Sequence, residues 1–198
     1  MFNVCTYCAQ YRTDKTVEKR GSSAVAICPL CQHPHPFIYA PLMILCGASG
    51  TGKTTTLHEL PALLRDDVVT LEADILLMGQ PIQEFAEMWL RVCKNVAQSG
   101  RPVLLGASGF IPPNVEDCIE RRYFSHVHYL AFTCEPDEQA ARLNARPAWR
   151  GTEWSDQLNY NRWIREESGL ELLDTTHISV AESAEKVRAW VKRCLDTK

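Results

Sequence analysis

Residues 45–60, LCGASGTGKTTTLHEL, decide the fold of this chain. Gly47, Gly52, Lys53 and Thr54 match the pattern G-x-x-x-x-G-K-[ST], directly after a short apolar run. Glycines let such a loop turn tightly and bring its backbone N–H groups onto phosphate oxygens. A helix that starts at the loop points its positive end at the same anion. The pattern therefore predicts a strand, a phosphate-binding loop (P-loop) and a helix, in that order.

We expect this loop to bind the phosphates of ATP together with Mg²⁺. Lys53 would reach the β- and γ-phosphates, and the hydroxyl of Thr54 would bind the metal ion. The alternative is a glycine-rich turn that binds nothing, which the expected strand and helix on either side disfavour. The predicted nucleotide-binding residues of the loop are Gly47, Ala48, Ser49, Gly50, Thr51, Gly52, Lys53, Thr54 and Thr55.

The composition is ordinary for a globular protein. The 198 residues, 45% hydrophobic and 23% charged, suffice for one domain with a small appendage. A net charge of −3 gives no general attraction to nucleic acid or to anionic membranes. No stretch approaches the ~20 apolar residues of a membrane span, and no apolar segment follows the charges near the N-terminus. We therefore expect a cytoplasmic protein without a signal peptide or membrane contact.

Four cysteines near the N-terminus have the spacing of a zinc site. Cys5 and Cys8 form one C-x₂-C pair, and Cys28 and Cys31 form a second pair after 19 residues. Two such pairs can close a tetrahedron of thiolates around one Zn²⁺. The polar segment between them predicts a hairpin. The sequence thus predicts a zinc-ribbon-like module over residues 1–36.

The remaining candidate metal ligands have simpler interpretations. His33 and His35 directly follow the second pair and could replace a thiolate, although four cysteines already complete a structural site. The other cysteines stand singly in apolar stretches, where cysteine acts as a small core residue. They are Cys46, Cys93, Cys118, Cys134 and Cys194.

Beyond residues 32–41, a proline-rich stretch that we expect to be a linker, predicted strands and helices alternate. This alternation indicates an α/β domain over residues 37–198, a three-layer P-loop NTPase fold with a parallel sheet. In such a sheet, ligands bind beyond the carboxyl ends of the strands. Strands are predicted at residues 42–46, 68–71, 103–105, 126–134 and 171–173. Helices are predicted from 53 to a break or kink at Pro61, from Pro81 to Gly100, at 114–122, 136–145 and 155–167, and after a capping box at Ser179.

The ends of the second and third predicted strands differ in charge. Asp74 follows the second strand in LEADILLMG, residues 71–79, and a carboxylate there can accept the proton of an acceptor hydroxyl or help to hold substrate or Mg²⁺. Because its neighbours are apolar, we expect the side chain of Asp74 to be enclosed. Two alternatives stay open: Glu72 has this role instead, or Asp74 is a solvated acid without a role. The third strand ends in GASG, residues 106–109, without the acid that a motor-type ATPase normally carries there.

Three arginines at steps of four follow the fourth predicted strand. Arg142 would project from a helix toward the nucleotide, while Arg146 and Arg150 flank a loop that contains Trp149 and Trp154. Guanidinium groups on a closing loop can stabilise the charge of a transferred phosphoryl group. A surface helix end with favourable cations is the alternative. The arginines and tryptophans together predict a lid.

From residue 42 onward the chain resembles the P-loop kinases of the nucleotide, shikimate and gluconate kinase group. The resemblance rests on the P-loop, the acid after the second strand, the weak third-strand motif and the arginines after the fourth strand. It implies an ATP-dependent kinase in which Lys53 and Thr54 serve the phosphates and Mg²⁺. It further implies that Asp74 serves the acceptor and that Arg146 and Arg150 belong to a lid. The zinc-ribbon-like module departs from the usual pattern of the group.

The end of the chain also resembles these kinases. Residues 172–191 are similar to the part in which the loop after the last strand packs by the adenine. The resemblance places Thr175, Thr176 and His177 in that loop. We therefore expect Thr176 and His177, together with Arg142, to contribute to nucleotide binding.

The leading hypothesis is an ATP-dependent phosphotransferase that acts on a small molecule. A nucleoside or nucleotide is the first choice of acceptor because of the resemblance to nucleotide kinases, and a sugar acid, cyclitol or aminoglycoside-like compound is the second. The alternative is a P-loop protein that works on nucleic acid through its zinc module: a polynucleotide 5′-hydroxyl kinase, or a nucleotide-dependent switch or ATPase. Cations and aromatic residues of the module could contact phosphates and bases. These are Tyr7, Tyr11, Arg12, Lys15, Lys19 and Arg20, interrupted by Asp14 and Glu18.

Overall fold

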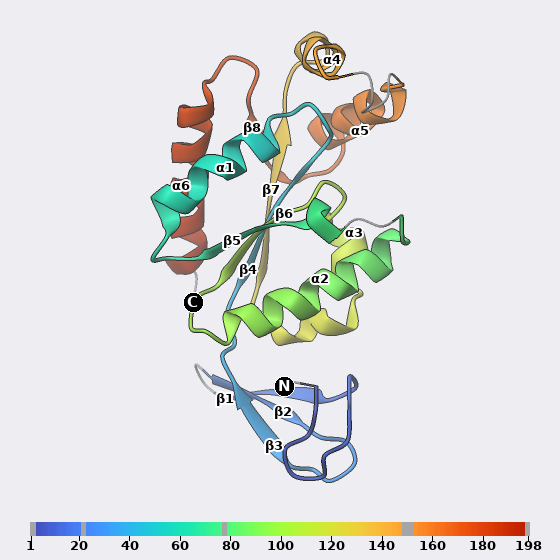
Figure 1. Cartoon of the computed structure of the whole chain (residues 1–198), viewed down its shortest axis with the longest axis vertical. Coiled ribbons are helices and arrows are strands. Elements are labelled where there is room, and N and C mark those ends of the chain that lie inside the picture. Colours follow the sequence, from blue (N-terminus) through green and yellow to red (C-terminus); the bar gives the residue numbers. More distant parts are fainter. Residues whose placement is uncertain (1–2, 21–22, 77–78, 148–152, 197–198) are drawn as a thin grey trace.

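The computed structural model describes residues 3–20, 23–76, 79–147 and 153–196 (Figure 1). Two sheets organise these residues: a large sheet that carries the P-loop and a small N-terminal sheet. The large sheet is parallel, with the strand order β5-β6-β4-β7-β8. Its strands are β4 (Leu42–Gly47), β5 (Val69–Glu72), β6 (Val103–Gly106), β7 (Val127–Thr133) and β8 (Glu171–Asp174). The predicted parallel α/β sheet is confirmed.

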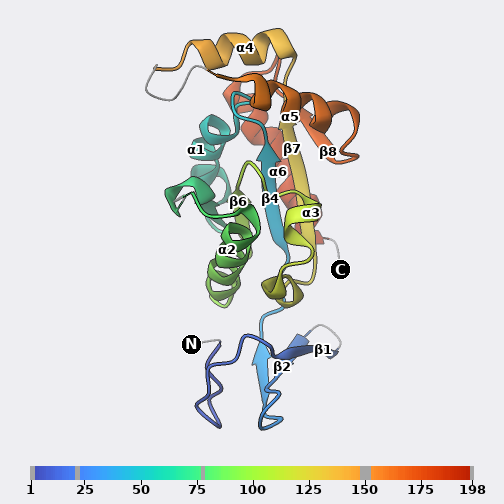
Figure 2. The ribbon, with the colours of Figure 1, turned by 90° about the vertical axis from the view of Figure 1, so that its right-hand side faces the viewer.

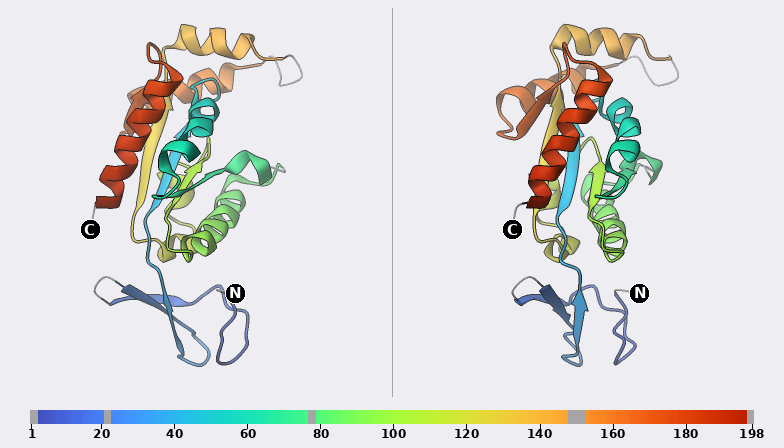
Figure 3. Two further views of the ribbon diagram at one scale, coloured as in Figure 1. Left: turned by 60° about the vertical axis from the view of Figure 1, so that its left-hand side comes forward. Right: turned by 90° about the vertical axis from the view of Figure 1, so that its left-hand side faces the viewer.

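Helices cover both faces of the large sheet and make three layers (Figures 2 and 3). The central strand β4 shows the reason for this covering of both faces. Its successive side chains point to opposite faces of the sheet, and the two sets belong to two different apolar clusters. Leu42 and Ile44 pack with α2, α3 and α5, whereas Met43 and Leu45 pack with α1 and α6. The helices are α1 (Lys53–Leu64), α2 (Ile82–Ala97), α3 (Pro112–Val115), α4 (Pro136–Asn144), α5 (Ser155–Glu166) and α6 (Val180–Asp196), with the 3-10 helices η1 (Ala73–Leu76) and η2 (Ile119–Tyr123).

Two predicted helices are wrong in detail. Of the predicted break or kink at Pro61, the break is wrong, because helix α1 continues through Pro61 to Leu64. An interior proline costs about 3 kcal/mol, but Leu60 and Leu64 are buried, and burial of each leucine contributes about 1.5–3 kcal/mol. Residues 114–122 form no single helix, because the extended backbone of Cys118, with ψ at 141°, separates α3 from η2.

The small sheet is antiparallel and consists of β1 (Thr16–Arg20), β2 (Ser23–Ile27) and β3 (Pro34–Phe37). Strands β1 and β2 are the predicted hairpin. Strand β3 lies inside the stretch expected to be a linker, so that expectation is wrong for these four residues. Strand β3 lies at the edge of the small sheet. Prolines are tolerated in an edge strand, because the position of the missing N–H group can face the side on which no further strand needs a hydrogen bond.

The N-terminal module is docked on the large domain through buried contacts. Tyr123, at the end of η2, belongs to the apolar cluster of the small sheet with Phe37. The ammonium of Lys94, on α2, donates to the side-chain oxygen of Asn3 at 2.8 Å and pairs with Glu120, and both charged side chains are fully buried. The two parts therefore share a core. The division of the chain at residue 36 stays a prediction.

The module lies at the opposite end of the large sheet from the P-loop (Figure 1). Strand β4 leads from the module to the P-loop, and its six residues span about 20 Å at ~3.3 Å per residue. Helix α2 also spans this length: Gln98, beyond its last turn, exchanges two hydrogen bonds with the backbone of Ile38. Among the described residues, no helix combines the length and apolarity needed to cross a membrane.

Candidate phosphate-transfer site and metal site

The P-loop connects β4 to α1 through three glycines with positive φ. Gly47, Gly50 and Gly52 have φ values of 131°, 88° and 90°, in the region that disfavours side chains. At Gly47 a Cβ atom would also lie 2.4 Å from the carbonyl oxygen of Phe132. Glycine is thus needed for conformation and for space, and the loop presents the N-terminus of a 12-residue helix.

The ammonium of Lys53 lies inside the loop. Its Nζ donates to the carbonyl oxygens of Gly47 at 2.6 Å and Ala48 at 2.8 Å. Burial lowers the pKa of Lys53 to about 8. The carboxylate of Asp74 raises this pKa, and the positive charge of Arg146 lowers it. The predicted catalytic residues Asp74 and Arg146 therefore both lie within electrostatic reach of Lys53.

This low pKa makes ATP binding depend on pH. The free loop loses the Lys53 proton as pH rises through about 8, whereas bound phosphate requires the charged form. Binding near pH 8 should therefore take up a proton, and affinity should fall by up to about tenfold per pH unit above it. Calorimetry in two buffers of different ionisation enthalpy measures the uptake. A Lys53→Arg variant, which keeps its charge, should show none, and equal uptake in both proteins would contradict the assignment.

Thr54 and the acids after β5 form the next part of the site. The hydroxyl of Thr54 donates to the carboxylate of Glu72 at 2.7 Å. Asp74 lies two residues after Glu72, on η1, and its side chain is exposed, so the expected enclosure is wrong. Its apolar neighbour Ile75 points to solvent instead of covering it, with 71% exposure. Thr54 and Glu72 together offer the oxygen ligands that suit Mg²⁺.

The small residues after β6 lie against the P-loop, as their size predicts. The carbonyl oxygen of Ser108 accepts the N–H of Gly47 at 3.2 Å and the hydroxyl of Tyr160 at 3.0 Å. A Cβ at Gly106 would lie 2.8 Å from Leu57 on α1. Lys53, Thr54, Glu72 and Asp74 line one small cavity with residues 106–108.

A cavity of about 200 Å³ opens on the other side of the P-loop. Arg142 donates to Glu138 at 2.7 Å, to the hydroxyl of Thr175 at 3.0 Å and to its carbonyl oxygen at 2.9 Å. Thr175 in turn donates to the carbonyl oxygen of Thr51 in the P-loop at 2.9 Å. The lining residues are Gly52, Thr55, Thr56, Arg142, Thr175, Ile178, Val180 and Ser183.

The structure places the two predicted adenine-side residues beside this cavity but not among its lining. The hydroxyl of Thr176 accepts the N–H of Glu135 at 2.8 Å and donates to Asp174 at 2.5 Å. His177 is exposed. Of the three residues that the resemblance put here, Thr175 is the one that faces the P-loop.

The loop between α4 and α5 carries the predicted lid. Arg150 and Trp149 lie outside the described residues. Two glutamines on the flanking helices hold the P-loop backbone: Gln157 accepts the N–H of Ser49 at 2.7 Å, and Gln139 donates to the Ser49 carbonyl at 2.8 Å. No sequence signal marks these glutamines, because they lie 90 residues or more from Ser49.

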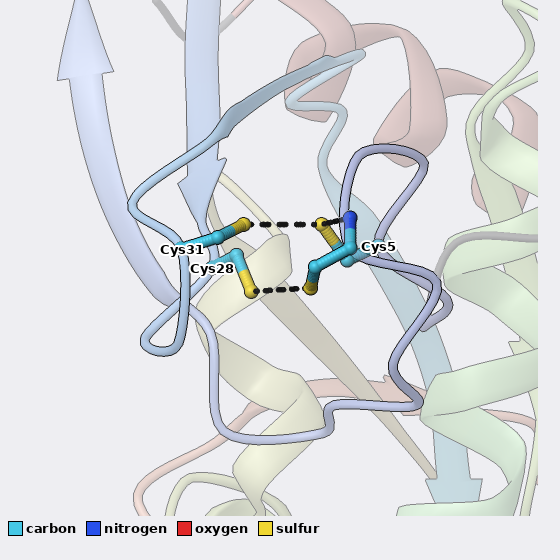
Figure 4. A group of neighbouring side chains, drawn as sticks. Cys5, Cys28 and Cys31 are labelled. Carbon is cyan, nitrogen blue, oxygen red and sulfur yellow. Dashed lines mark hydrogen bonds between the residues drawn. The ribbon is translucent and has the colours of Figure 1, made fainter.

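The four predicted zinc ligands come together in the N-terminal module (Figure 4). Their sulfur atoms lie within 4.8 Å of one another, with Cys5 to Cys31 at 3.6 Å and Cys8 to Cys28 at 3.9 Å. A tetrahedron with Zn–S bonds of ~2.3 Å has edges of about 3.8 Å, so the cluster fits zinc. The nitrogen Nε2 of His35 lies 3.3 Å from the sulfur of Cys5, at the distance of a partner that orients a ligand.

Solved structures share this fold. A sugar kinase from Janibacter sp. HTCC2649 is 16% identical, with 77% of this chain and 95% of that chain covered at a TM-score of 0.59. A gluconokinase from Sinorhizobium meliloti 1021 is 17% identical (80% and 95% covered, TM-score 0.55). Shikimate kinase from Acinetobacter baumannii, in complex with shikimate, is 18% identical (80% and 96%, TM-score 0.53). No protein-family model and no curated protein matches the chain. The predicted resemblance is thereby confirmed for the fold, which this chain shares with these three kinases.

Proposed function

We propose that this chain is an ATP-dependent kinase that transfers the γ-phosphoryl group to a small molecule, with a nucleoside or nucleotide as first choice and a sugar acid as second. The arrangement of Lys53, Thr54 and Glu72 around the start of α1 carries the proposal, because it joins a phosphate cradle to oxygen ligands for Mg²⁺. The acid-free end of β6 supports transfer over mechanical ATPase work.

Each residue then has a distinct task. The N–H groups of the P-loop and Lys53 hold the phosphates, and Mg²⁺ bound near Thr54 would neutralise charge on the β- and γ-oxygens. Asp74 takes the proton of the acceptor hydroxyl as its oxygen bonds to the γ-phosphorus, and the bond to the β–γ bridging oxygen breaks to release ADP. Arg146, with Arg150, stabilises charge on the transferred group. Arg142 holds the nucleotide side of the loop.

The N-terminal module has a separate task. We propose that Cys5, Cys8, Cys28 and Cys31 hold one structural Zn²⁺ as thiolates, with no open coordination position. Nucleic-acid binding by the module is not our proposal, since three cations of the suggested cluster are engaged otherwise. Lys15 is fully buried, Arg12 pairs with Asp14, and Arg20 lies 3.5 Å from Glu18.

The function is tested by measuring ATP consumption and labelled product with panels of nucleosides, nucleotides, sugars, sugar acids, aminocyclitols and oligonucleotides. Transfer to a small-molecule hydroxyl supports the proposal. Transfer restricted to oligonucleotide 5′-hydroxyls would replace it with the polynucleotide alternative. ATP hydrolysis that no compound changes would favour a switch or an ATPase.

Substitutions of Glu72 and Asp74 should differ in their effects on ATP hydrolysis and on phosphoryl transfer. Asp74→Asn should spare ATP binding and slow hydrolysis but suppress transfer to the acceptor by about 10²- to 10⁴-fold, because only transfer needs its proton acceptor. Glu72→Gln should lower hydrolysis and transfer together, since it weakens the metal position beside Thr54. Parallel assays of both activities, with metal titration, give the comparison. Equal loss of both activities in Asp74→Asn would show a metal role for Asp74 instead.

A further inference from the structure

The acceptor side of the phosphate site can be located from the nucleotide side. The cavity lined by Arg142 and Thr175 lies where β8 and α6 meet the P-loop. In an in-line transfer, the attacking and leaving oxygens stand on opposite sides of the γ-phosphorus. With the rest of the nucleotide on the β8 side, the acceptor approaches over β6 and β5, where Asp74 and residues 106–108 lie.

The two segments that enclose this side carry no positive charge. Residues 72–90, which run from the carboxyl end of β5 through η1 into α2, have four acids and no Lys, Arg or His. Residues 102–120, which contain β6 and α3, have three acids and again no Lys, Arg or His. The adjacent carboxyl ends of β5 and β6 thus bring together two segments that contain no Lys, Arg or His.

Tertiary packing places several of these acids around one space. A cavity of about 310 Å³ lies between α2 and the α3–η2 segment. Glu84, Glu87 and Asp117 line it, together with the amides of Gln83 and Asn114. An anion in this region would face carboxylates, and like charges placed together oppose binding.

Apolar side chains are exposed on the same side. Ile75, directly after Asp74, is 71% exposed, and Leu76 and Ile82 are 37% and 39% exposed. Ile82 stands at the first position of α2, at its open end. These side chains offer contact area for the carbon skeleton of a ligand.

The cations that directly follow these two segments in the sequence face other groups. Arg91 donates to Glu120 at 2.9 Å, and Arg121 donates to Glu116 at 2.8 Å. Arg146 lies within electrostatic reach of Lys53, and the function proposed above assigns it to the transferred phosphoryl group. On the β5 and β6 segments themselves, the sequence supplies no cation that could recognise a carboxylate or a phosphate.

We infer, on the basis of the kinase function proposed above, that the acceptor is an alcohol without negative charge, neutral or cationic, with an apolar face. This inference narrows the range of acceptors proposed above: nucleosides stay among the candidates, nucleotides and sugar acids are excluded, and aminocyclitols fit as well. The hydroxyl oxygen gains the bond to phosphorus, its proton passes to Asp74, and ADP leaves with the electrons of the broken bond.

The charge of the acceptor can be measured before its identity is known. A deproteinised cell extract is separated at neutral pH on an anion exchanger, and each fraction is incubated with the full chain and ATP labelled on its γ-phosphate. Lys53-dependent labelling in the unretained fraction, which holds neutral and cationic compounds, is the expected result. Labelling confined to the retained anions would overturn the inference while keeping the kinase. Labelling in neither fraction would contradict the kinase function itself, and this inference with it.

A matched pair of variants tests the location. Ile82 and Val180 are both 39% exposed, the first on the acceptor side and the second in the lining of the nucleotide-side cavity. Ile82→Arg should raise the KM for the acceptor fraction by about tenfold or more with little change for ATP, and Val180→Arg should do the reverse. An Ile82→Arg enzyme with an unchanged acceptor KM would place the acceptor elsewhere and overturn the assignment.

Discussion

Replacement of Lys53 by alanine is expected to abolish phosphoryl transfer while the chain stays folded. Lys53 is the cation that the P-loop itself holds, on the carbonyl oxygens of Gly47 and Ala48. Loss of one preorganised donor costs about 10²- to 10³-fold in rate, and loss of a full charge at the transferred group should cost at least as much. Alanine at the first position of α1 favours the helix, so the fold should persist.

The measurement compares single-turnover transfer and thermal unfolding in the variant and the native chain. Lys186→Ala is the matched control, because it removes the same charge from an exposed position on α6. Lys186→Ala should keep native transfer. Native turnover in folded Lys53→Ala would show that the P-loop is not the catalytic centre.

Removal of zinc should unfold the N-terminal module and loosen the part of the large domain on which it is docked. Structural zinc sites bind with apparent free energies of about 10–16 kcal/mol, and that energy is folding energy. Because Tyr123 lies in the core of the module and Lys94 bonds to Asn3, loss of the module exposes groups of η2 and α2. We therefore expect Cys28→Ala to lose zinc and to increase hydrogen exchange in both segments.

Metal analysis should return about one zinc per native chain, as four thiolate ligands for one ion require. Cys194→Ala, a buried cysteine on α6, is the matched control and should keep the metal. Lys94→Met should keep the metal as well, but it should destabilise the docked state by about 1–3 kcal/mol, because the buried carboxylate of Glu120 loses one of its two cationic partners and keeps Arg91. A disulfide between the cysteine pairs, or a native chain without zinc, would refute the site. Native exchange in α2 after loss of zinc would refute the coupling.

Local patterns in the sequence were enough to predict the P-loop and the cysteine cluster, because each of them is built from short motifs of neighbouring residues. The P-loop depends on glycine conformations and on a helix start, which neighbouring residues determine, and Gly47, Gly50 and Gly52 have the positive φ that this requires. The zinc cluster depends on two C-x₂-C turns, each of which forms locally. The alternation of apolar strands and amphipathic helices predicted the parallel sheet for the same reason.

Only the tertiary structure decided the features that join residues far apart in the chain. The bonds of Gln157 and Gln139 to Ser49 join helices to the P-loop, and the buried pair of Lys94 with Glu120 joins α2 to η2; no local pattern contains the relative placement of these elements. The exposure of Asp74 was also decided there, because solvent access depends on what packs over a residue and not on its sequence neighbours. Strand β3 became part of the small sheet for the same reason: a proline-rich segment is a linker by composition, and an edge strand only when a partner strand lies beside it.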